Sequence, residues 1–337
     1  MQPQNPITPG SEHNSASGAL WAVASATAYS LSSVVGKDLL DSLGPPSLLF
    51  WRFSIAAVVL WIAVLVWHRN GGPNPLAVPR RMMLGLGMGF GLMVLTGFLA
   101  LERIDASVYI VVIYLYPVFV VVGSAVLGLL PARFTWAALA LVMVGIVLTV
   151  PELFTGVGDL NAVGVVLTLA QAVIFAIYMI VSDRVVPRTI DGVVTAAWIV
   201  LGASVVITPI ALVVGLARPH GHQLVFEVAV FALIPTVVST ICFFQAMRHI
   251  TPGAVAMVQT LEVALVILWA VTFLGEKLEA IKVAGAVVVV AGVLLAQWAN
   301  LRESRLGVVP LVTLRLPTSG GLLRRRSPRT ATRKPPR

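Results

Sequence analysis

The sequence predicts an all-α integral membrane protein with ten transmembrane helices arranged as two inverted five-helix repeats. The first observation behind this fold class is composition: of 337 residues, 58% are hydrophobic and only 11% are charged. Soluble proteins are about 25% charged. A chain this apolar would leave most of its hydrophobic side chains without an interior to occupy, so a soluble globular domain is excluded.

The second observation is a series of uncharged stretches of the length that crosses a bilayer, about 20 residues each. Turn residues such as Gly44, Pro45 and Pro46 separate them, as expected between helices. The stretches cover residues 19–38, 48–67, 82–101, 106–130, 134–150, 161–182, 192–216, 228–247, 252–274 and 280–298.

The third observation is an internal repeat. A shift of 146 residues places Gly18 on Gly164, Tyr29 on Phe175 and Ile104 on Ile250, and later matches need one further residue. The chain therefore contains two copies of a five-helix unit. Because five is odd, the second copy must cross the membrane in the opposite sense to the first, an arrangement typical of secondary transporters.

These observations divide the chain into two tails and two repeats. Residues 1–18 contain no Lys or Arg and so lack the positive region of a cleaved signal. We expect them to form a disordered cytoplasmic tail before a first repeat at 19–150 and a second at 151–299. Residues 300–337 form a basic tail that we also expect to be disordered.

Charge places both termini in the cytoplasm of a cell, or inner, membrane. Ten spans return the chain to its starting side, and the last 37 residues hold ten basic residues and one acid. On this assignment 17 basic residues lie inside and six outside. A polybasic segment beside a membrane helix favours contact with anionic lipid, and we do not expect a nucleic-acid partner.

Glu262 is the most informative single residue. It is the only carboxylate between Arg248 and Glu276, with 13 uncharged residues on either side, which places it near mid-bilayer. A carboxylate there costs at least about 2.5 kcal/mol on insertion scales, so such residues usually face the bundle interior and pair with a cation, a proton or a substrate. The alternative is a protonated side chain that hydrogen bonds to a neighbouring helix for packing alone.

Other residues complete the candidate site for the solute or proton. Lys37 and Arg52 lie near the outer ends of the first two spans, where they could steer an anionic group; interfacial snorkelling is the alternative. Gln259 shares a helical face with Glu262. Further polar side chains at span depth could line a cavity or bond between helices, namely Tyr29, Tyr114, Gln171 and Tyr178.

Motifs for other chemistry are missing from the sequence. A single cysteine, Cys242, excludes a disulfide framework and a cysteine-based metal centre. His220 and His222 have no third ligand nearby. Hydrolase and nucleotide-binding patterns are also absent from the sequence, so we expect no enzyme activity, no metal and no cofactor.

Several short motifs together resemble the EamA-type branch of the drug/metabolite transporter superfamily. The resemblance covers residues 18–298. The motifs are Gly-Ala-Leu-Trp-Ala at 18–22, Phe-Trp-Arg-Phe at 50–53, Phe-Leu-Ala-Leu-Glu-Arg-Ile at 98–104, Tyr-Pro-Val at 116–118, Phe-Gln-Ala-Met-Arg-His-Ile at 244–250, Leu-Glu-Val at 261–263 and Phe-Leu-Gly-Glu at 273–276.

The resemblance implies an exporter or exchanger of amino acids, metabolites or drugs. It matches Glu262 to the acidic position of helix nine and Glu276 to the family's Leu-Gly-Glu helix end. Val263 stands where the family usually has proline, and Leu127-Gly128-Leu129 lacks the corresponding acid of the first repeat. Glu276 is therefore interpreted as a structural helix end rather than half of a symmetric pair.

The resulting hypothesis is a secondary transporter that moves a small amino acid-like or drug-like solute by alternating access, driven by protons or by the solute's own gradient. Two alternatives stay open. A membrane-embedded enzyme or lipid-handling protein would need acids or histidines clustered at one membrane face, and a cation channel would need a ring of like charges from several subunits.

Overall fold

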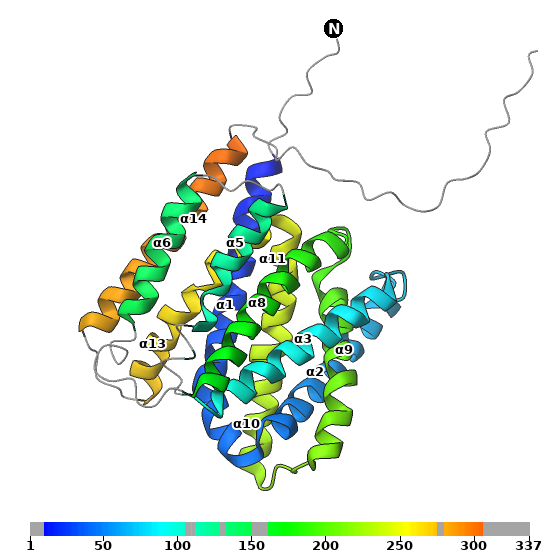
Figure 1. Ribbon diagram of the computed structural model, residues 1–337. Coiled ribbons are helices and arrows are strands. Elements are labelled where there is room, and N and C mark those ends of the chain that lie inside the picture. Colours follow the sequence, from blue (N-terminus) through cyan, green and yellow to red (C-terminus); the bar gives the residue numbers. More distant parts are fainter. Residues whose placement is uncertain are drawn as a thin grey trace, which may run out of the picture.

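Helices account for the secondary structure in a computed structural model of the protein, which describes residues 10–104, 109, 112–127, 133–149, 161–274 and 280–305 (Figure 1). Within these residues the helices fall in ten spans, which confirms the predicted fold class. Their bounds are α1 Gly10–Leu43, α2 Pro45–Arg69, α3 Arg80–Leu101, α5 Tyr116–Val126, α6 Arg133–Leu148, α8 Ala162–Val185, α9 Gly192–Val214, α10 His222–Ala232, η1 Leu233–Val238, α11 Ser239–His249, α12 Pro252–Gln259, α13 Leu261–Leu274 and α14 Ala280–Arg305.

Two helices extend beyond the apolar stretches from which they were predicted. α1 begins at Gly10, before the predicted tail ends at residue 18, and α14 continues to Arg305, past the predicted start of the basic tail at residue 300. The reason is that hydropathy locates the bilayer, whereas backbone hydrogen bonds can continue a helix into water.

Length and composition fit a membrane protein. Among the described residues, five helices are long and apolar enough to cross a bilayer: α2, α3, α8, α9 and the continuous segment His222–His249. Shorter apolar helices cover Tyr116–Val126, Phe134–Leu148, Pro252–Val266 and Ala280–Ala296. The exposed faces of these helices carry large apolar side chains, as a surface in contact with lipid tails requires.

The helix contacts repeat when the two halves of the chain are exchanged. α1 packs on α11 and η1 of the second repeat, and α8 packs on α3 of the first. In the same way α13 contacts α1 while α5 contacts α8. The pairs α2 with α9, and α6 with α14, map onto themselves. Figure 1 shows α6 and α14 side by side at one edge of the bundle.

Two glycines mark this symmetry at atomic scale. A methyl group on Gly18 of α1 would lie 2.7 Å from side-chain atoms of His249 and Ile250. Gly164 of α8, 146 residues later, is packed in the same way by Ile104. The same glycine–isoleucine contact therefore occurs in both repeats. A larger side chain in place of either glycine would separate α1 from α11, or α8 from α3.

Two tryptophans form a second symmetric pair. Trp51 and Trp198 are each the seventh residue of their helix, α2 and α9. The Trp51 indole donates to the Ala217 carbonyl at 3.0 Å, and the Trp198 indole donates to the Pro75 carbonyl at 2.9 Å. A tryptophan of each repeat is thus hydrogen bonded to a loop of the other repeat.

Three interruptions disturb the helices near the middle of their spans. Tyr114 and Leu115 form a turn before α5, and Thr260 separates α12 from α13. The third is the π-helix η1, where Pro235 cannot donate a backbone hydrogen bond to the Phe231 carbonyl. The Thr236 hydroxyl donates to that carbonyl instead, at 3.3 Å.

Candidate functional site

Glu262 lies in the first turn of α13, directly after the interruption at Thr260. Its side chain is partly exposed, and its carboxyl group interacts with the Tyr114 side chain. Tyr114 itself belongs to the turn before α5, and α5 packs on α12. The two interrupted spans, one from each repeat, therefore bring the acid and this tyrosine together.

Four tyrosines lie within electrostatic range of this carboxyl group. Tyr29, Tyr109 and Tyr116 lie within electrostatic range of Glu262, in addition to Tyr114. The Tyr114 and Tyr116 rings are 6.0 Å apart, and Tyr116 stacks on Phe175 of α8 at 4.6 Å. The cluster presents hydroxyl groups and aromatic faces together, a combination that suits a partly apolar organic solute.

Gln259 is buried one turn before Glu262 and belongs to a polar bridge between the repeats. Its amide nitrogen donates to the Ser25 hydroxyl of α1 at 3.0 Å. Ser25 donates in turn to the Ser239 carbonyl at 3.0 Å. The Gln259 amide oxygen is buried and has no partner in the described part of the chain. A buried acceptor without a donor is costly, so this oxygen is available to a ligand.

A second bridge lies at the equivalent place in the other repeat. The Tyr109 hydroxyl donates to the Gln171 amide oxygen of α8 at 3.0 Å. Gln171 follows Ser25 by 146 residues, the repeat shift. Gln171 also fills the space beside Gly97, where a methyl group would collide with its side chain. The fourth span of each repeat is thus hydrogen bonded to the first span of the other.

Arg52 is buried inside the helix bundle. Its side chain is only 1% exposed. Its Nε donates to the Thr236 hydroxyl at 2.6 Å, and Nη2 donates to the Pro235 carbonyl at 3.2 Å. The guanidinium lies 5.9 Å from the Tyr29 ring, which connects it to the Glu262 cluster.

The remaining candidates separate from this cluster or cannot be placed. Tyr178 is buried, and its ring packs on Phe90 at 5.7 Å, on the α3 side of α8. The side chains of Lys37 and Glu276 lie outside the described residues. The structure therefore brings Glu262, Gln259, Tyr29 and Tyr114 together and adds Arg52 beside Tyr29.

Sequence reasoning missed Ser25, Ser239 and Thr236, which are all buried. Ser25 and Thr236 are bonded to the candidates Gln259 and Arg52, and Ser239 is bonded to Ser25. Small hydroxyl residues are common in transmembrane helices, so their presence alone indicates little. One signal was available: Ser25 occupies the position that the repeat shift assigns to Gln171.

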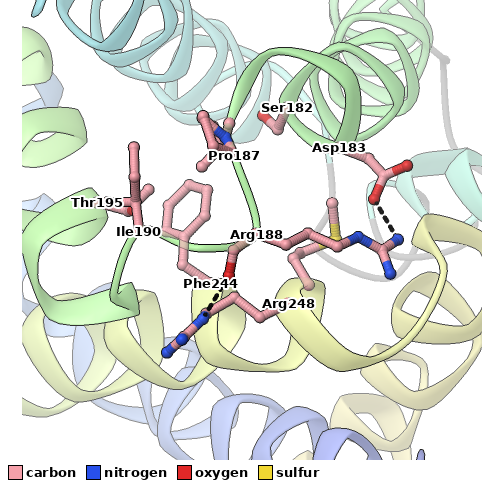
Figure 2. A pocket seen from close by; sticks show the side chains of 10 residues that line it. Ser182, Asp183, Pro187, Arg188, Ile190, Thr195, Phe244 and Arg248 are labelled. Atoms are coloured by element: carbon pink, nitrogen blue, oxygen red, sulfur yellow. Dashed lines mark hydrogen bonds and ion pairs between the residues drawn. The ribbon is translucent and has the colours of Figure 1, made fainter. Parts of the chain in front are cut away.

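A separate polar cluster lies where α8, α9 and α11 end or begin (Figure 2). Arg248 pairs with Asp191 at 3.0 Å and donates to the Gln245 amide oxygen at 2.7 Å and to the Arg188 carbonyl at 3.0 Å. Arg188 pairs with Asp183 at 2.8 Å. This network fastens the 186–191 connector to α11 and borders a small pocket with Ser182 and Phe244 in its wall.

Metal chemistry has no support in the described part of the chain, which contains no group of three or more His, Cys, Asp or Glu residues able to hold an ion. The Glu262 cluster instead offers one carboxyl group, an amide oxygen, hydroxyl groups and aromatic faces. These groups can bind a solute or a proton, and nothing in the arrangement places a nucleophile beside a base.

Comparison with known proteins agrees with this architecture. The EamA-like transporter family matches the chain twice, at residues 16–150 and 162–298. One solved crystal structure is similar to this fold, with a TM-score of 0.73 and 19% sequence identity. The superposition covers 86% of this chain and 99% of the other chain. At that identity the likeness concerns the fold alone. A comparison with curated proteins finds no match.

Proposed function

Because the chain belongs to the EamA-like transporter family, we propose that it exports or exchanges a small organic solute by alternating access, with Glu262 at the centre of the binding site. The family makes the protein a multi-pass membrane transporter. The observation that carries the finer proposal is the position of Glu262: the carboxyl group meets Tyr114 where two interrupted spans from opposite repeats come together.

A site between inverted repeats supports alternating access. If the two repeats exchange conformations, a group held between them is presented first to one side of the membrane and then to the other. Tyr29 and Gln259 come from α1 and α12, while Tyr114 and Gln171 come from the fourth span and α8. Both repeats therefore supply groups that would change position relative to Glu262.

Glu262 would bind a proton or a cationic group of the solute. Gln259, Gln171 and the tyrosines would orient the solute through hydrogen bonds and ring contacts, with Tyr178 further along α8. Lys37 would attract solutes near the outer end of α1. The driving force in this proposal is a gradient of protons or of the solute itself.

Orientation follows from charge. With both termini in the cytoplasm, the segments at 69–81 and 186–191 lie inside, and they carry Arg69, Arg80, Arg81 and Arg188. The basic C-terminal tail would then meet the anionic lipids of the cytoplasmic leaflet, which would help to fix the orientation.

The test is transport by purified protein in liposomes. The solutes to assay are those whose amounts differ between cells that produce the wild type and cells that produce Glu262→Gln. We expect saturable uptake or efflux by the wild type and a loss of at least about tenfold in Glu262→Gln, because the substitution removes a charge-bearing partner of the proton or solute.

Glu102→Gln is the matched control, since Glu102 is an exposed acid that pairs only loosely with Arg103, at 3.7 Å. It should transport like the wild type. Saturation with full activity in Glu262→Gln would remove Glu262 from the mechanism. An unsaturable ionic current would indicate a channel, and formation of a product would indicate an enzyme.

A further inference from the structure

Arg52 is a buried cation whose hydrogen bonds go to neutral groups. Its donors reach the Thr236 hydroxyl and the Pro235 carbonyl, and Nη1 is buried with no hydrogen-bond partner in the described residues. The salt bridges of these residues do not include Arg52. Holding a guanidinium away from water without a carboxylate is costly, so this arrangement leaves Arg52 short of a counterion.

Aromatic rings compensate part of this cost. The guanidinium carbon lies 4.6 Å from the Phe231 ring centroid, 5.8 Å from Phe53 and 5.9 Å from Tyr29. Such contacts stabilise a cation. They do not neutralise its charge.

The fold itself does not require a cation at this position. Arg52 is the eighth residue of α2, and the eighth residue of α9 in the other repeat is Ile199. Ile199 is fully buried, and its carbonyl lies directly against Gly87. The same architecture is therefore built in one repeat with an apolar side chain and in the other with a charged one, which points to a role beyond packing.

We propose that Arg52 binds a carboxylate group of the transported solute, a proposal that rests on the transport function above. The Arg52 guanidinium lies 5.9 Å from the Tyr29 ring of α1, and α1 packs on α13, the helix that carries Glu262. The planar fork of a guanidinium matches the two oxygens of a carboxylate. One cation neutralises one negative charge, so a doubly charged phosphate would leave an uncompensated charge in an apolar site.

In the structure the Arg52 donors are bonded to the Thr236 hydroxyl and the Pro235 carbonyl. A bound carboxylate competes with these two neutral acceptors for the same donors, because a charged acceptor forms the stronger bond. Its binding therefore loosens the contact between α2 and η1. Since η1 is a π-helical interruption held by side-chain bonds, it is the segment of the eighth span most easily rearranged.

The experiment measures thermal unfolding of the purified full-length protein in detergent, at constant ionic strength, with sodium benzoate as the probe. Benzamide is the uncharged analogue, and sodium phosphate is the doubly charged one. The variants are Arg52→Gln, Arg52→Lys and Thr236→Val. Arg103→Gln is the control, because Arg103 is exposed and donates to the Leu99 carbonyl in the last turn of α3.

We expect benzoate, but neither benzamide nor phosphate, to raise the unfolding midpoint of the wild type and of Arg103→Gln. Arg52→Gln should lose this response, and Arg52→Lys should need about tenfold more benzoate because an ammonium lacks the planar fork. Thr236→Val should respond at about fivefold lower benzoate, since a competing acceptor is removed. A purely structural Arg52 would not give this gain.

The proposal is overturned if benzoate fails to stabilise the wild type, if benzamide or phosphate acts equally, or if Arg52→Gln responds like the wild type. The Lys and Val variants keep the test informative should Arg52→Gln fail to fold. The outcome is separable from that of the transport assay: loss of benzoate binding with intact, Glu262-dependent transport refutes the Arg52 assignment alone, and benzoate binding without transport refutes the transport function.

Discussion

The contact of α9 with α3 and the contact of α2 with η1 occupy equivalent places in the two repeats, but they are built in opposite ways. Gly87 and Gly91 of α3 meet Gly202 and Ala203 of α9 so closely that a methyl group on Gly202 would lie 2.8 Å from the Gly87 Cα. At the other contact Arg52 bonds to Thr236 and Pro235 in a π-helical turn.

The difference separates a rigid interface from an adjustable one. Backbone against backbone leaves nothing that can change rotamer, so α3 and α9 are held in a single arrangement. Side-chain hydrogen bonds can be exchanged for others at little net cost. We therefore expect the α2–η1 contact to move during transport and the α3–α9 contact to stay fixed.

The largest loss of stability should come from placing an arginine in the α3–α9 interface, at the position equivalent to Arg52. Ile199→Arg places a guanidinium in a fully buried position, and the neighbouring α3 is a continuous α-helix without a π-turn to supply acceptors. A buried unpaired charge costs about 3–5 kcal/mol, which would leave little folded protein. Size-exclusion chromatography of the purified variant measures this loss. Ile199→Val is the control and should lose only about 1 kcal/mol; a well-folded Ile199→Arg would contradict the proposed rigidity.

The converse change, Arg52→Leu, should be tolerated. It removes an uncompensated charge, and the Thr236 hydroxyl keeps its bond to the Phe231 carbonyl. The Pro235 carbonyl loses a donor, so the expected cost is about 1–2 kcal/mol. Thermal unfolding should show a folded protein, and the liposome assay should show little transport. A midpoint loss as large as that of Ile199→Arg would mean that the two contacts are equally rigid.

Two glycines in one helix test the rigid side more gently. Gly87→Ala inserts a methyl group against the Ile199 carbonyl and should cost about 1–3 kcal/mol through overpacking. Gly89, two residues along, has nothing within 4 Å of a methyl group. Gly89→Ala should therefore stabilise α3 by about 0.5–1 kcal/mol through helix propensity alone. Equal midpoints for the two variants would show that α3 and α9 are less tightly packed.

The sequence predicts where the helices of the two repeats lie, but it does not predict where those helices are interrupted. Apolar spans and the 146-residue shift locate the helices and pair Gly18 with Gly164, because both signals come from local composition and order. The helix is interrupted at Thr260 without a glycine or proline there, so the sequence does not indicate this break. It places Glu262 in the first turn of a new helix.

The partners of the candidate residues are equally hidden in the sequence. Arg52 meets Thr236 across 184 positions, and Gln259 meets Ser25 across 234. Such pairs depend on how the two repeats pack, and neither residue type nor spacing specifies them. The sequence thus identifies Glu262 and Gln259 as polar groups at span depth and Arg52 as a cation near a span end, whereas their hydrogen bonds and the burial of Arg52 follow from tertiary contacts.

The smallest expected effect concerns the symmetric tryptophans, where the two repeats use the same contact in different surroundings. Trp198 is buried and packs at 5.1 Å on Trp61, whereas the hydrogen bond of Trp51 is exposed. Trp198→Phe should cost about 1–2 kcal/mol, because the Pro75 carbonyl loses its donor in a buried place. Trp51→Phe should cost less than about 0.5 kcal/mol, since water can replace the indole at the Ala217 carbonyl.

The two indole hydrogen bonds differ in length by only a tenth of an ångström. A difference between the unfolding midpoints of the two variants therefore reports the effect of burial rather than of bond geometry. A larger loss for Trp51→Phe would place the more rigid loop contact in the half of the molecule that contains Arg52, and the assignment of mobility to that half would then be wrong.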